Sequence, residues 1–156
     1  MAKPTAPEGT HLVAKNKKAY FNYVVEDKLE AGLVLTGSEV KSLRAGRCNL
    51  GDSYAVPKNG ELFLLNCNIS PYDHALLGHD PLRSRKLLLH KTEITKTIAK
   101  VTERGLTLVP LAIYFKHGRA KVEIGVCKGK QEFDKRASIA EREGKREIDR
   151  ASKKRR

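Results

Sequence analysis

The chain has 156 residues, about the size of one domain, and its 31 lysines and arginines against 18 acidic residues give a formal net charge of +13. Its apolar runs fall well short of the roughly 20 residues that a membrane-spanning helix needs, so we expect no membrane partner. A balance this basic favours nucleic acid as the partner instead.

The first third of the chain predicts a flexible arm, two strands and a short helix. Residues 1–10 hold two prolines and a glycine, which indicates a flexible N-terminal arm. Residues 16–25 are rich in aromatic and β-branched side chains and predict a strand, and residues 31–37 predict a second strand that pairs with it in antiparallel fashion. A helix then begins with Ser38 as its N-cap and ends at Gly46.

The middle of the chain predicts a hairpin followed by two helical segments. Residues 52–56 and 61–69 read as strands joined by a turn at Asn59-Gly60, the dipeptide that hairpins favour. Residues 83–90 have a helical pattern. A second helical run starts with Thr92 as its cap and stops at Gly105.

The last regular segments predict a second hairpin. Residues 106–116 form a long strand, His117-Gly118 the turn, and residues 119–126 the returning strand, whose Ala, Val and Ile residues alternate with polar ones. The total is six strands with about three helices. Many short strands with added helices predict a mainly β fold with some α, a small closed or nearly closed antiparallel barrel, over residues 11–130.

A basic tail follows the barrel. Residues 128–156 contain twelve Lys or Arg and six Asp or Glu, a net charge of 12 − 6 = +6. The helical stripe of this tail consists mostly of Ala and Gly, so burying it would recover little of the entropy lost on ordering. The tail is either a solubilising charge run or a segment that is disordered alone and becomes a basic helix on an anionic surface.

The three cysteines, Cys48, Cys67 and Cys127, are widely spaced and include no Cys-x-x-Cys pair. This spacing argues against a disulfide framework and a zinc finger, and it is typical of a protein of the reducing cytosol. We expect Cys67 and Cys127 to be small buried apolar residues. No apolar segment of the signal-peptide type precedes residue 10, so the predicted location is cytoplasmic.

No group of residues predicts catalysis. His74 and His79 lie in a loop beside acidic residues, but without a third ligand they are typical of surface histidines, so we expect neither a metal site nor a cofactor. The segment 125–130 resembles a phosphate-binding loop, but it is one residue too short and no Ser or Thr follows its lysine.

The basic side chains are the positive signal, because Lys and Arg at element ends and in loops hold phosphates. Four aromatic residues offer stacking surfaces for bases or, alternatively, belong to the core: Tyr20, Phe21, Tyr23 and Tyr72. Composition and pattern together predict an RNA-binding protein.

Several stretches together resemble the bacterial SsrA-binding proteins, also called small protein B, which are partners of transfer-messenger RNA. The matching segments, in family order, are residues 16–19, 30–44, 52–54, 85–90, 109–111 and 128–136. The resemblance implies an oligonucleotide-binding-type (OB-like) barrel with flanking helices. It also implies an adaptor without catalysis, which binds the tRNA-like domain of transfer-messenger RNA and delivers it, with elongation factor Tu, to stalled ribosomes.

The resemblance places RNA contacts at Asn16, Glu30 and Leu88. Asn16 would offer an amide to the RNA, Glu30 would hydrogen-bond a base or fix a basic neighbour, and Leu88 would pack on a helix or contact a base. The basic residues expected to bind the same RNA are Lys17, Lys18, Lys41, Arg44, Arg85, Lys86, Lys128 and Lys130. A general rRNA-binding, tRNA-binding or ribosomal protein is the alternative, and a metal-dependent nuclease using His74, His79 and Asp80 is a third hypothesis.

The resemblance also gives the tail a role on 16S rRNA, at the decoding centre and in the empty messenger channel. Residues 131–156 are then disordered alone and helical on the ribosome, in a protein expected to be a monomer. Phe133 would stack on an rRNA base. The positions implied are Gly129, Phe133, Asp134, Lys135, Arg136, Arg142, Arg146, Ile148 and Arg150.

Overall fold

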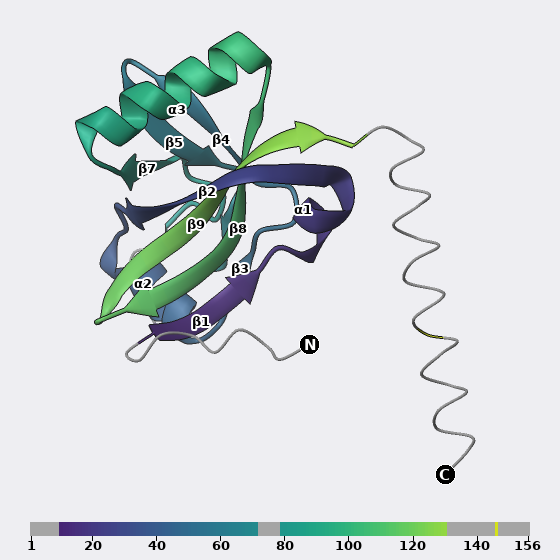
Figure 1. Cartoon of the computed structure of the whole chain (residues 1–156). Helices are drawn as coiled ribbons and strands as arrows, with labels where there is room; N and C mark the ends of the chain where they lie inside the picture. The colour runs from purple at the N-terminus through teal and green to yellow at the C-terminus, as the bar shows by residue number, and fades with distance from the viewer. Residues whose placement is uncertain (1–9, 72–78, 131–145, 147–156) are drawn as a thin grey trace.

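A computed structural model describes residues 10–71, 79–130 and 146. Three helices and nine strands occupy this part of the chain (Figure 1). In chain order they are β1 (Thr10–Lys15), α1 (Lys17–Asn22), β2 (Tyr23–Leu33), α2 (Gly37–Arg44), β3 (Cys48–Asn49), β4 (Tyr54–Lys58), β5 (Glu61–Leu65), β6 (Asn68–Ile69), β7 (Arg85–Leu88), α3 (Lys91–Arg104), β8 (Thr107–Lys116) and β9 (Arg119–Gly129).

Six strands form a closed antiparallel ring. Their order is β8-β4-β5-β7-β2-β9, and the pairing of β9 with β8 closes it. Strand β1 lies outside this ring and pairs with residues 112–116 of β8. Strands β3 and β6 form a separate two-stranded sheet. This closure removes the open edges that a sheet would otherwise expose. The predicted mainly β, OB-like six-stranded barrel with three helices is confirmed.

The barrel interior is filled by apolar side chains at alternate strand positions. Leu62 and Leu64 of β5 and Val122 and Ile124 of β9 have no measurable exposure. Each such side chain contributes roughly 1.5–3 kcal/mol when taken fully out of water. The alternation predicted for residues 119–126 is confirmed as far as Ile124, as the two-residue period of a strand requires, but Gly125 is buried together with its neighbours.

Helices close off the ring on opposite sides, with α3 above it and α2 below it in Figure 1. Helix α3 packs Ile94, Ile98 and Val101 against the barrel core and ends at Gly105, whose φ of 61° is left-handed. Its N-cap is His90 rather than the predicted Thr92, and His90 makes no side-chain capping bond.

Helix α2 begins earlier than the sequence suggested. Thr36, not Ser38, is its N-cap, and Thr36 and Glu39 form a reciprocal capping box. Gly46, with a φ of 74°, follows the last turn as predicted.

Three segment assignments were wrong. Residues 17–22 form α1 instead of a strand, because the Asn16 side chain accepts the Ala19 backbone N–H and caps a helix. Residues 31–33 end the eleven-residue strand β2 and do not form a separate strand. Residues 85–88 form β7, which inserts between β2 and β5, where the helical pattern had suggested a helix.

Two tight turns join the long hairpins as predicted. Asn59 and Gly60 have φ values of 53° and 74°, and His117 and Gly118 have values of 50° and 78°, as hairpin turns of this kind require. A positive φ of 56° at Asn66 was not expected. It divides the predicted strand 61–69 into β5 and β6.

Cys67 and Cys127 are fully buried, which confirms the expectation from sequence. Within residues 10–71 and 79–130, no helix is long and apolar enough to cross a membrane. The predicted N-terminal arm lies outside the described residues except for Thr10, which starts β1. The tail predictions also lie outside them, apart from Gly129, which ends β9, and Arg146, whose side chain is exposed.

Candidate RNA interface

One cross-strand row of residues crosses the outer surface of the barrel. The backbone register pairs Leu88 with Gly32, Gly32 with Lys121, Lys121 with Tyr114, and Tyr114 with Leu12. Residues in direct register lie on the same face of a sheet, so these side chains form one continuous strip. We call it the Leu88 row.

Leu88 and Lys121 flank a position without a side chain. A Cβ atom built on Gly32 would lie 3.2 Å from the Leu88 Cβ. The Leu88 side chain therefore lies over Gly32, next to Lys121, and its outer side is exposed. A flat aromatic base fits such a site, since the base needs an apolar contact and its phosphate needs a positive charge.

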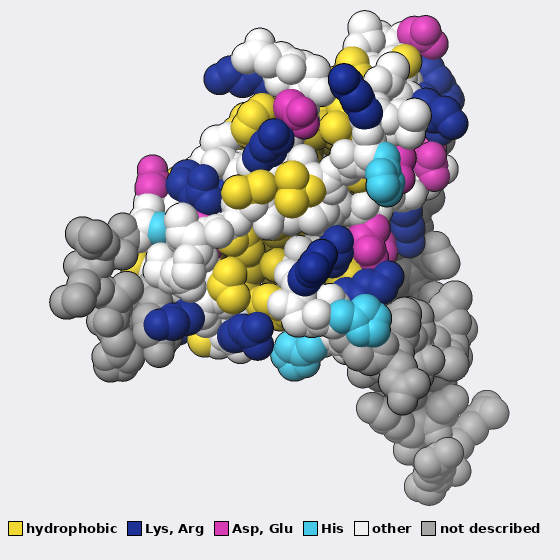
Figure 2. Space-filling view, turned by 90° about the vertical axis from the view of Figure 1, so that its left-hand side faces the viewer, with side chains coloured by type: hydrophobic (Ala, Val, Ile, Leu, Met, Phe, Trp, Pro, Cys, Tyr) yellow, Lys and Arg dark blue, Asp and Glu magenta, His cyan; other side chains and the backbone are white. Residues whose placement is uncertain are grey.

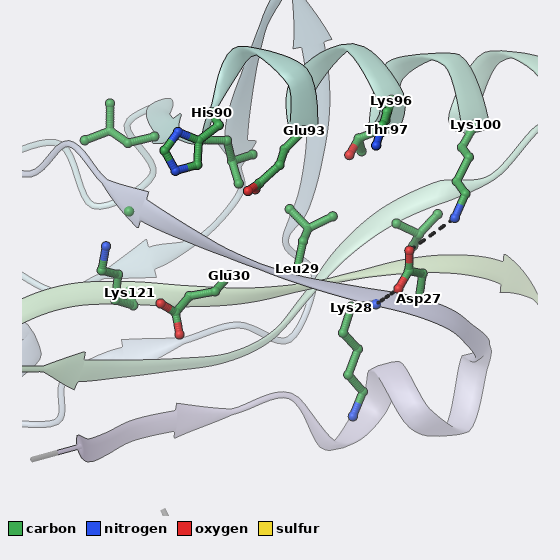
Figure 3. A pocket seen from close by; sticks show the side chains of 14 residues that line it. Asp27, Lys28, Leu29, Glu30, His90, Glu93, Lys96, Thr97, Lys100 and Lys121 are labelled. Atoms are coloured by element: carbon green, nitrogen blue, oxygen red, sulfur yellow. Dashed lines mark hydrogen bonds and ion pairs between the residues drawn. The ribbon is translucent and has the colours of Figure 1, made fainter. Parts of the chain in front are cut away.

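A hollow of about 800 Å³ opens beside this row, between α3 and strands β2 and β9 (Figure 3). Gly32, Leu88 and Lys121 line it, and they also line a second hollow of about 300 Å³ toward α2. Leu88 is 52% exposed at the boundary of the two. On this side of the molecule, apolar surface lies among scattered Lys, Arg and His side chains (Figure 2).

The larger hollow is lined by both signs of charge, with cations in excess. In Figure 3, Leu29 points toward α3 and Glu93 points down toward β2, while Lys28 and Glu30 point away from α3. The charged lining residues are Asp27, Lys28, Glu30, Glu93, Lys96, Lys100 and Lys121.

An ion pair ties α3 to β2 at one end of this hollow. The Lys100 ammonium lies 3.1 Å from the Asp27 carboxylate, and this hydrogen bond lowers the pKa of Asp27. Both groups are about half exposed, so the pair contributes little to stability. It fixes the distance between helix and strand more than it stabilises the fold.

Glu30 holds two neighbours on β8. Its carboxylate accepts a hydrogen bond from the Tyr114 hydroxyl and lies 3.5 Å from the Lys116 ammonium. The Tyr114 bond, helped by Lys116, lowers the pKa of Glu30, so the group stays ionised at neutral pH. Of the two roles predicted for Glu30, fixing a basic neighbour is the one with a partner in the structure.

The second hollow connects the row to α2. The Arg44 guanidinium lies 4.9 Å from the centre of the Phe115 ring, and Phe115 lines that hollow. This stacking holds an exposed cation of α2 beside the Leu88 row. Lys41, on the same helix, is also exposed.

A separate basic group gathers where α1 meets the end of β9. The Lys130 backbone N–H donates to the Asn22 carbonyl at 2.9 Å, and Lys128 is in register with Val24 of β2. Exposed Lys17 and Lys18 of α1 therefore share one end of the barrel with Lys128 and Lys130. Tyr20 is 39% exposed there, whereas Tyr23 packs partly against a buried cluster.

Asn16 is a structural residue in this arrangement, which corrects its predicted amide contact with RNA. The side chain is 3% exposed, and its amide donates to the carbonyls of Leu50 and Pro110 while its oxygen caps α1. Its amide is thus fully used inside the protein. By capping α1, Asn16 holds in place the helix that carries Lys17 and Lys18.

Arg85, which was predicted to bind the RNA, is also a structural residue. Its side chain has no exposed surface; it is paired with the Glu39 carboxylate and also donates to the carbonyls of Cys67, Arg83 and Pro81. A guanidinium engaged in this way cannot meet a phosphate. Lys86 beside it is partly exposed and lies 3.9 Å from Glu61.

Leu88 ends strand β7, so it is not part of a helix. Its side chain is half exposed, and the apolar contact with a base stays a prediction.

Among residues 10–71 and 79–130, no group of three or more metal-ligating side chains is present. His79, part of the nuclease hypothesis, is bound by the Ser38 hydroxyl at 2.8 Å through Nδ1 and by the Ile69 carbonyl at 2.7 Å through Nε2. Both ring nitrogens are therefore engaged within the fold. His74 lies outside the described residues.

Tyr114, Lys121 and Gly32 were not predicted from sequence as members of the interface. Lys121 was seen on the polar face of the strand 119–126, and that alternation was the available signal. Their convergence depends on the pairing of β2 with both β7 and β9, which sequence does not give.

Comparison with known proteins places this geometry in context. The pattern of the family described as "SmpB protein" matches residues 13–154. The SsrA-binding protein of Desulfitobacterium hafniense is 56% identical over 146 residues, covering 93% of this chain and 94% of the relative. That of Myxococcus xanthus is 56% identical over 148 residues, covering 94% and 91%.

This chain is also similar to a chain of a solved structure. A chain of the structure reported as "tmRNA-SmpB: a journey to the center of the bacterial ribosome" superposes with a TM-score of 0.65 at 46% identity. The match covers 76% of this chain and 85% of that chain.

Proposed function

Since this chain belongs to the SmpB family of SsrA-binding proteins, we propose that it is the RNA-binding adaptor of ribosome rescue. It binds the tRNA-like domain of transfer-messenger RNA and brings that RNA to stalled ribosomes for trans-translation. The observation that carries the proposal is the family match, which runs through barrel and tail alike. The similarity to a chain of the tmRNA–SmpB ribosome structure supports the same partners.

The Leu88 row supplies the specific part of the RNA contact in this proposal. A base packs on the exposed side of Leu88, and Lys121 meets the adjoining phosphate. Glu30 does not touch the RNA but sets the positions of Tyr114 and Lys116. Lys41 and Arg44 of α2 and Lys86 of β7 extend the positive surface.

The basic end of the barrel, formed by Lys17, Lys18, Lys128 and Lys130, leads into the tail. We assign this end to RNA backbone contacts, because clustered lysines attract phosphates without reading bases. Beyond Lys130 the chain enters the messenger channel next to the decoding centre, and Gly129, at the end of β9, lies just before this segment. The residues that we assign to the ribosome are Gly129, Phe133, Asp134, Lys135, Arg136, Arg142, Arg146, Ile148 and Arg150.

The protein performs no chemistry of its own in this scheme. Elongation factor Tu joins through the RNA, the protein acts as a monomer, and its place of work is the ribosome in the cytoplasm. The engaged ring nitrogens of His79 support an adaptor over a nuclease.

Competition binding tests the proposal against a general RNA-binding protein. We expect the full chain to bind the tRNA-like domain in a complex that an ordinary elongator tRNA displaces poorly at equal salt. Raising salt should weaken both complexes through counterion release, with a log–log slope of roughly −0.7 to −0.9 per phosphate contacted. Equal affinity for both RNAs at every salt concentration would favour the general binder.

Two leucines of nearly equal exposure test whether RNA binds at the Leu88 row or at other exposed apolar side chains. Leu88→Ser should weaken the specific complex by about tenfold, since covering the half-exposed leucine with a base contributes roughly 1–1.5 kcal/mol, about half of what full burial gives. Leu82 is 53% exposed and lines neither hollow, so Leu82→Ser should leave binding unchanged. Equal effects of both substitutions would remove the Leu88 row from the interface.

A further inference from the structure

Two of the three cysteines lie against each other. The Cys48 and Cys67 sulfur atoms are 3.8 Å apart, and both thiols are free. Cys48 of β3 is in register with Ile69 of β6, so Cys67, two residues before Ile69, is its diagonal neighbour. The two side chains come from segments 19 residues apart that a short sheet brings together.

The two thiols differ in access. Cys67 has no exposed surface, whereas Cys48 is partly exposed, so a small reagent in solution reaches Cys48 first. Cys127 is also buried, but it belongs to a different apolar cluster with Ala19, Val109 and Leu111.

The surroundings favour Cys67 as the attacking group in a second step. The hydrogen bond between the two thiols lowers the pKa of Cys67 and raises the pKa of Cys48, and the nearby Arg85 guanidinium also favours the Cys67 thiolate. Arg85 also fixes this segment, because its Nη1 donates to the Cys67 carbonyl at 2.7 Å. A fixed, activated sulfur beside an accessible one is the arrangement of a resolving cysteine.

We propose that Cys48 and Cys67 form a redox modification site, which closes to a reversible disulfide when the protein meets a hydroperoxide. The Cys48 thiol passes its proton along the hydrogen bond to the Cys67 sulfur as the Cys48 sulfur attacks the hydroperoxide oxygen: an S–O bond forms, the O–O bond breaks, and water or an alcohol leaves after taking a proton from solvent. This gives a sulfenic acid on Cys48. The Cys67 sulfur then attacks the Cys48 sulfur, forming the S–S bond and releasing water. In total, two thiols lose two electrons and two protons, and one hydroperoxide takes up both.

The geometry requires a small movement. The sulfur atoms must approach from 3.8 Å to a bond length of about 2.05 Å. The two backbone segments next to the cysteines are already joined by a hydrogen bond, in which the Ser70 N–H donates to the Arg47 carbonyl at 3.1 Å. The disulfide would close a loop that contains the β4–β5 hairpin, and loop closure raises the melting temperature by roughly 5–10 °C.

Intact-mass measurement tests the site. After brief treatment of the folded full chain with hydrogen peroxide, we expect a loss of two hydrogen masses, restored by dithiothreitol. Trypsin, which cleaves after Lys58, should then yield peptide 48–58 joined to peptide 59–83. Cys127→Ser should behave like the unaltered protein, whereas Cys48→Ser should not lose the two hydrogens.

Other outcomes overturn the proposal. They are a gain of oxygen without the joined peptides, or a mass loss that Cys127→Ser prevents. The peptide map on the unaltered chain decides the question even if a substituted protein folds poorly.

Discussion

A chain ended after Lys130 is expected to bind the tRNA-like domain almost as tightly as the full chain and to support no tagging on stalled ribosomes. The barrel is complete at this point, since β9 ends at Gly129 and the Lys130 N–H bonds to the Asn22 carbonyl. All members of the Leu88 row lie before the cut. The removed segment holds ten Lys or Arg and six Asp or Glu, so its charge alone adds mainly salt-sensitive, non-specific attraction.

The measurement pairs two assays on the same preparations. Equilibrium binding to the tRNA-like domain is compared with tag addition in a translation system stalled on a message without a stop codon. Phe133→Ala in the full chain is the finer variant, and it should reduce tagging more than binding. Loss of specific RNA affinity in the shortened chain would contradict the division of work between barrel and tail.

Glu39→Gln is expected to destabilise the fold by roughly 3–5 kcal/mol, because it breaks a buried ion pair and leaves a buried charge unmatched. Neither the Glu39 nor the Arg85 side chain is exposed, and Arg83 lies 2.6 Å from the other Glu39 oxygen. Glu39 also accepts the Thr36 N–H in the capping box of α2. The substitution therefore loosens α2, β7 and the loop before β7 together.

The same pair predicts a pH dependence. Burial alone raises the pKa of Glu39, but hydrogen bonds from Arg83, the Thr36 N–H and Arg85 outweigh it and lower the pKa from 4.5 to about 2. A carboxyl with a lowered folded-state pKa contributes stability above its unfolded value of 4.5 and loses it as pH falls toward 2. The lowered pKa of Glu39 corresponds to about 3 kcal/mol of unfolding free energy at neutral pH.

Urea denaturation at neutral pH and through this acid range measures both effects. Glu61→Gln is the matched control, because Glu61 pairs with Lys86 at 3.9 Å while both side chains are about 40% exposed. That change should shift the unfolding free energy by less than about 0.5 kcal/mol. If Glu39→Gln were equally mild, or if its stability fell with acid as steeply as that of the unaltered chain, the buried pair would not be a main support of this part of the fold.

The barrel was predictable where local pattern and tertiary position agree. Strands β8 and β9 alternate on either side of their Gly turn, although residues 108–111 and 124–127 are buried throughout, and α3 carries an apolar stripe that ends at Gly105. Their types were therefore correctly predicted. Residues 17–22 were misassigned because their aromatic composition favours a strand. One buried Asn16 side chain, held by carbonyls of distant segments, stabilises a helix there instead.

The interface was predictable only in part. Leu88 and Glu30 were named through family resemblance; Leu88 is exposed and Glu30 holds Tyr114, while their roles toward RNA stay predictions. Arg85 looked like any other cation in the sequence. Its partner Glu39 is 46 residues away, and nothing local distinguishes a buried arginine from an exposed one.

The most direct test of the adaptor role is reconstituted rescue. The purified full chain and transfer-messenger RNA are added, separately and together, to a translation system that lacks both and is stalled at the end of a message without a stop codon. We predict that the tag is added to the stalled product only when both are present. Tag addition with the RNA alone, or no tag when both are present although the chain binds the tRNA-like domain, would contradict the adaptor role.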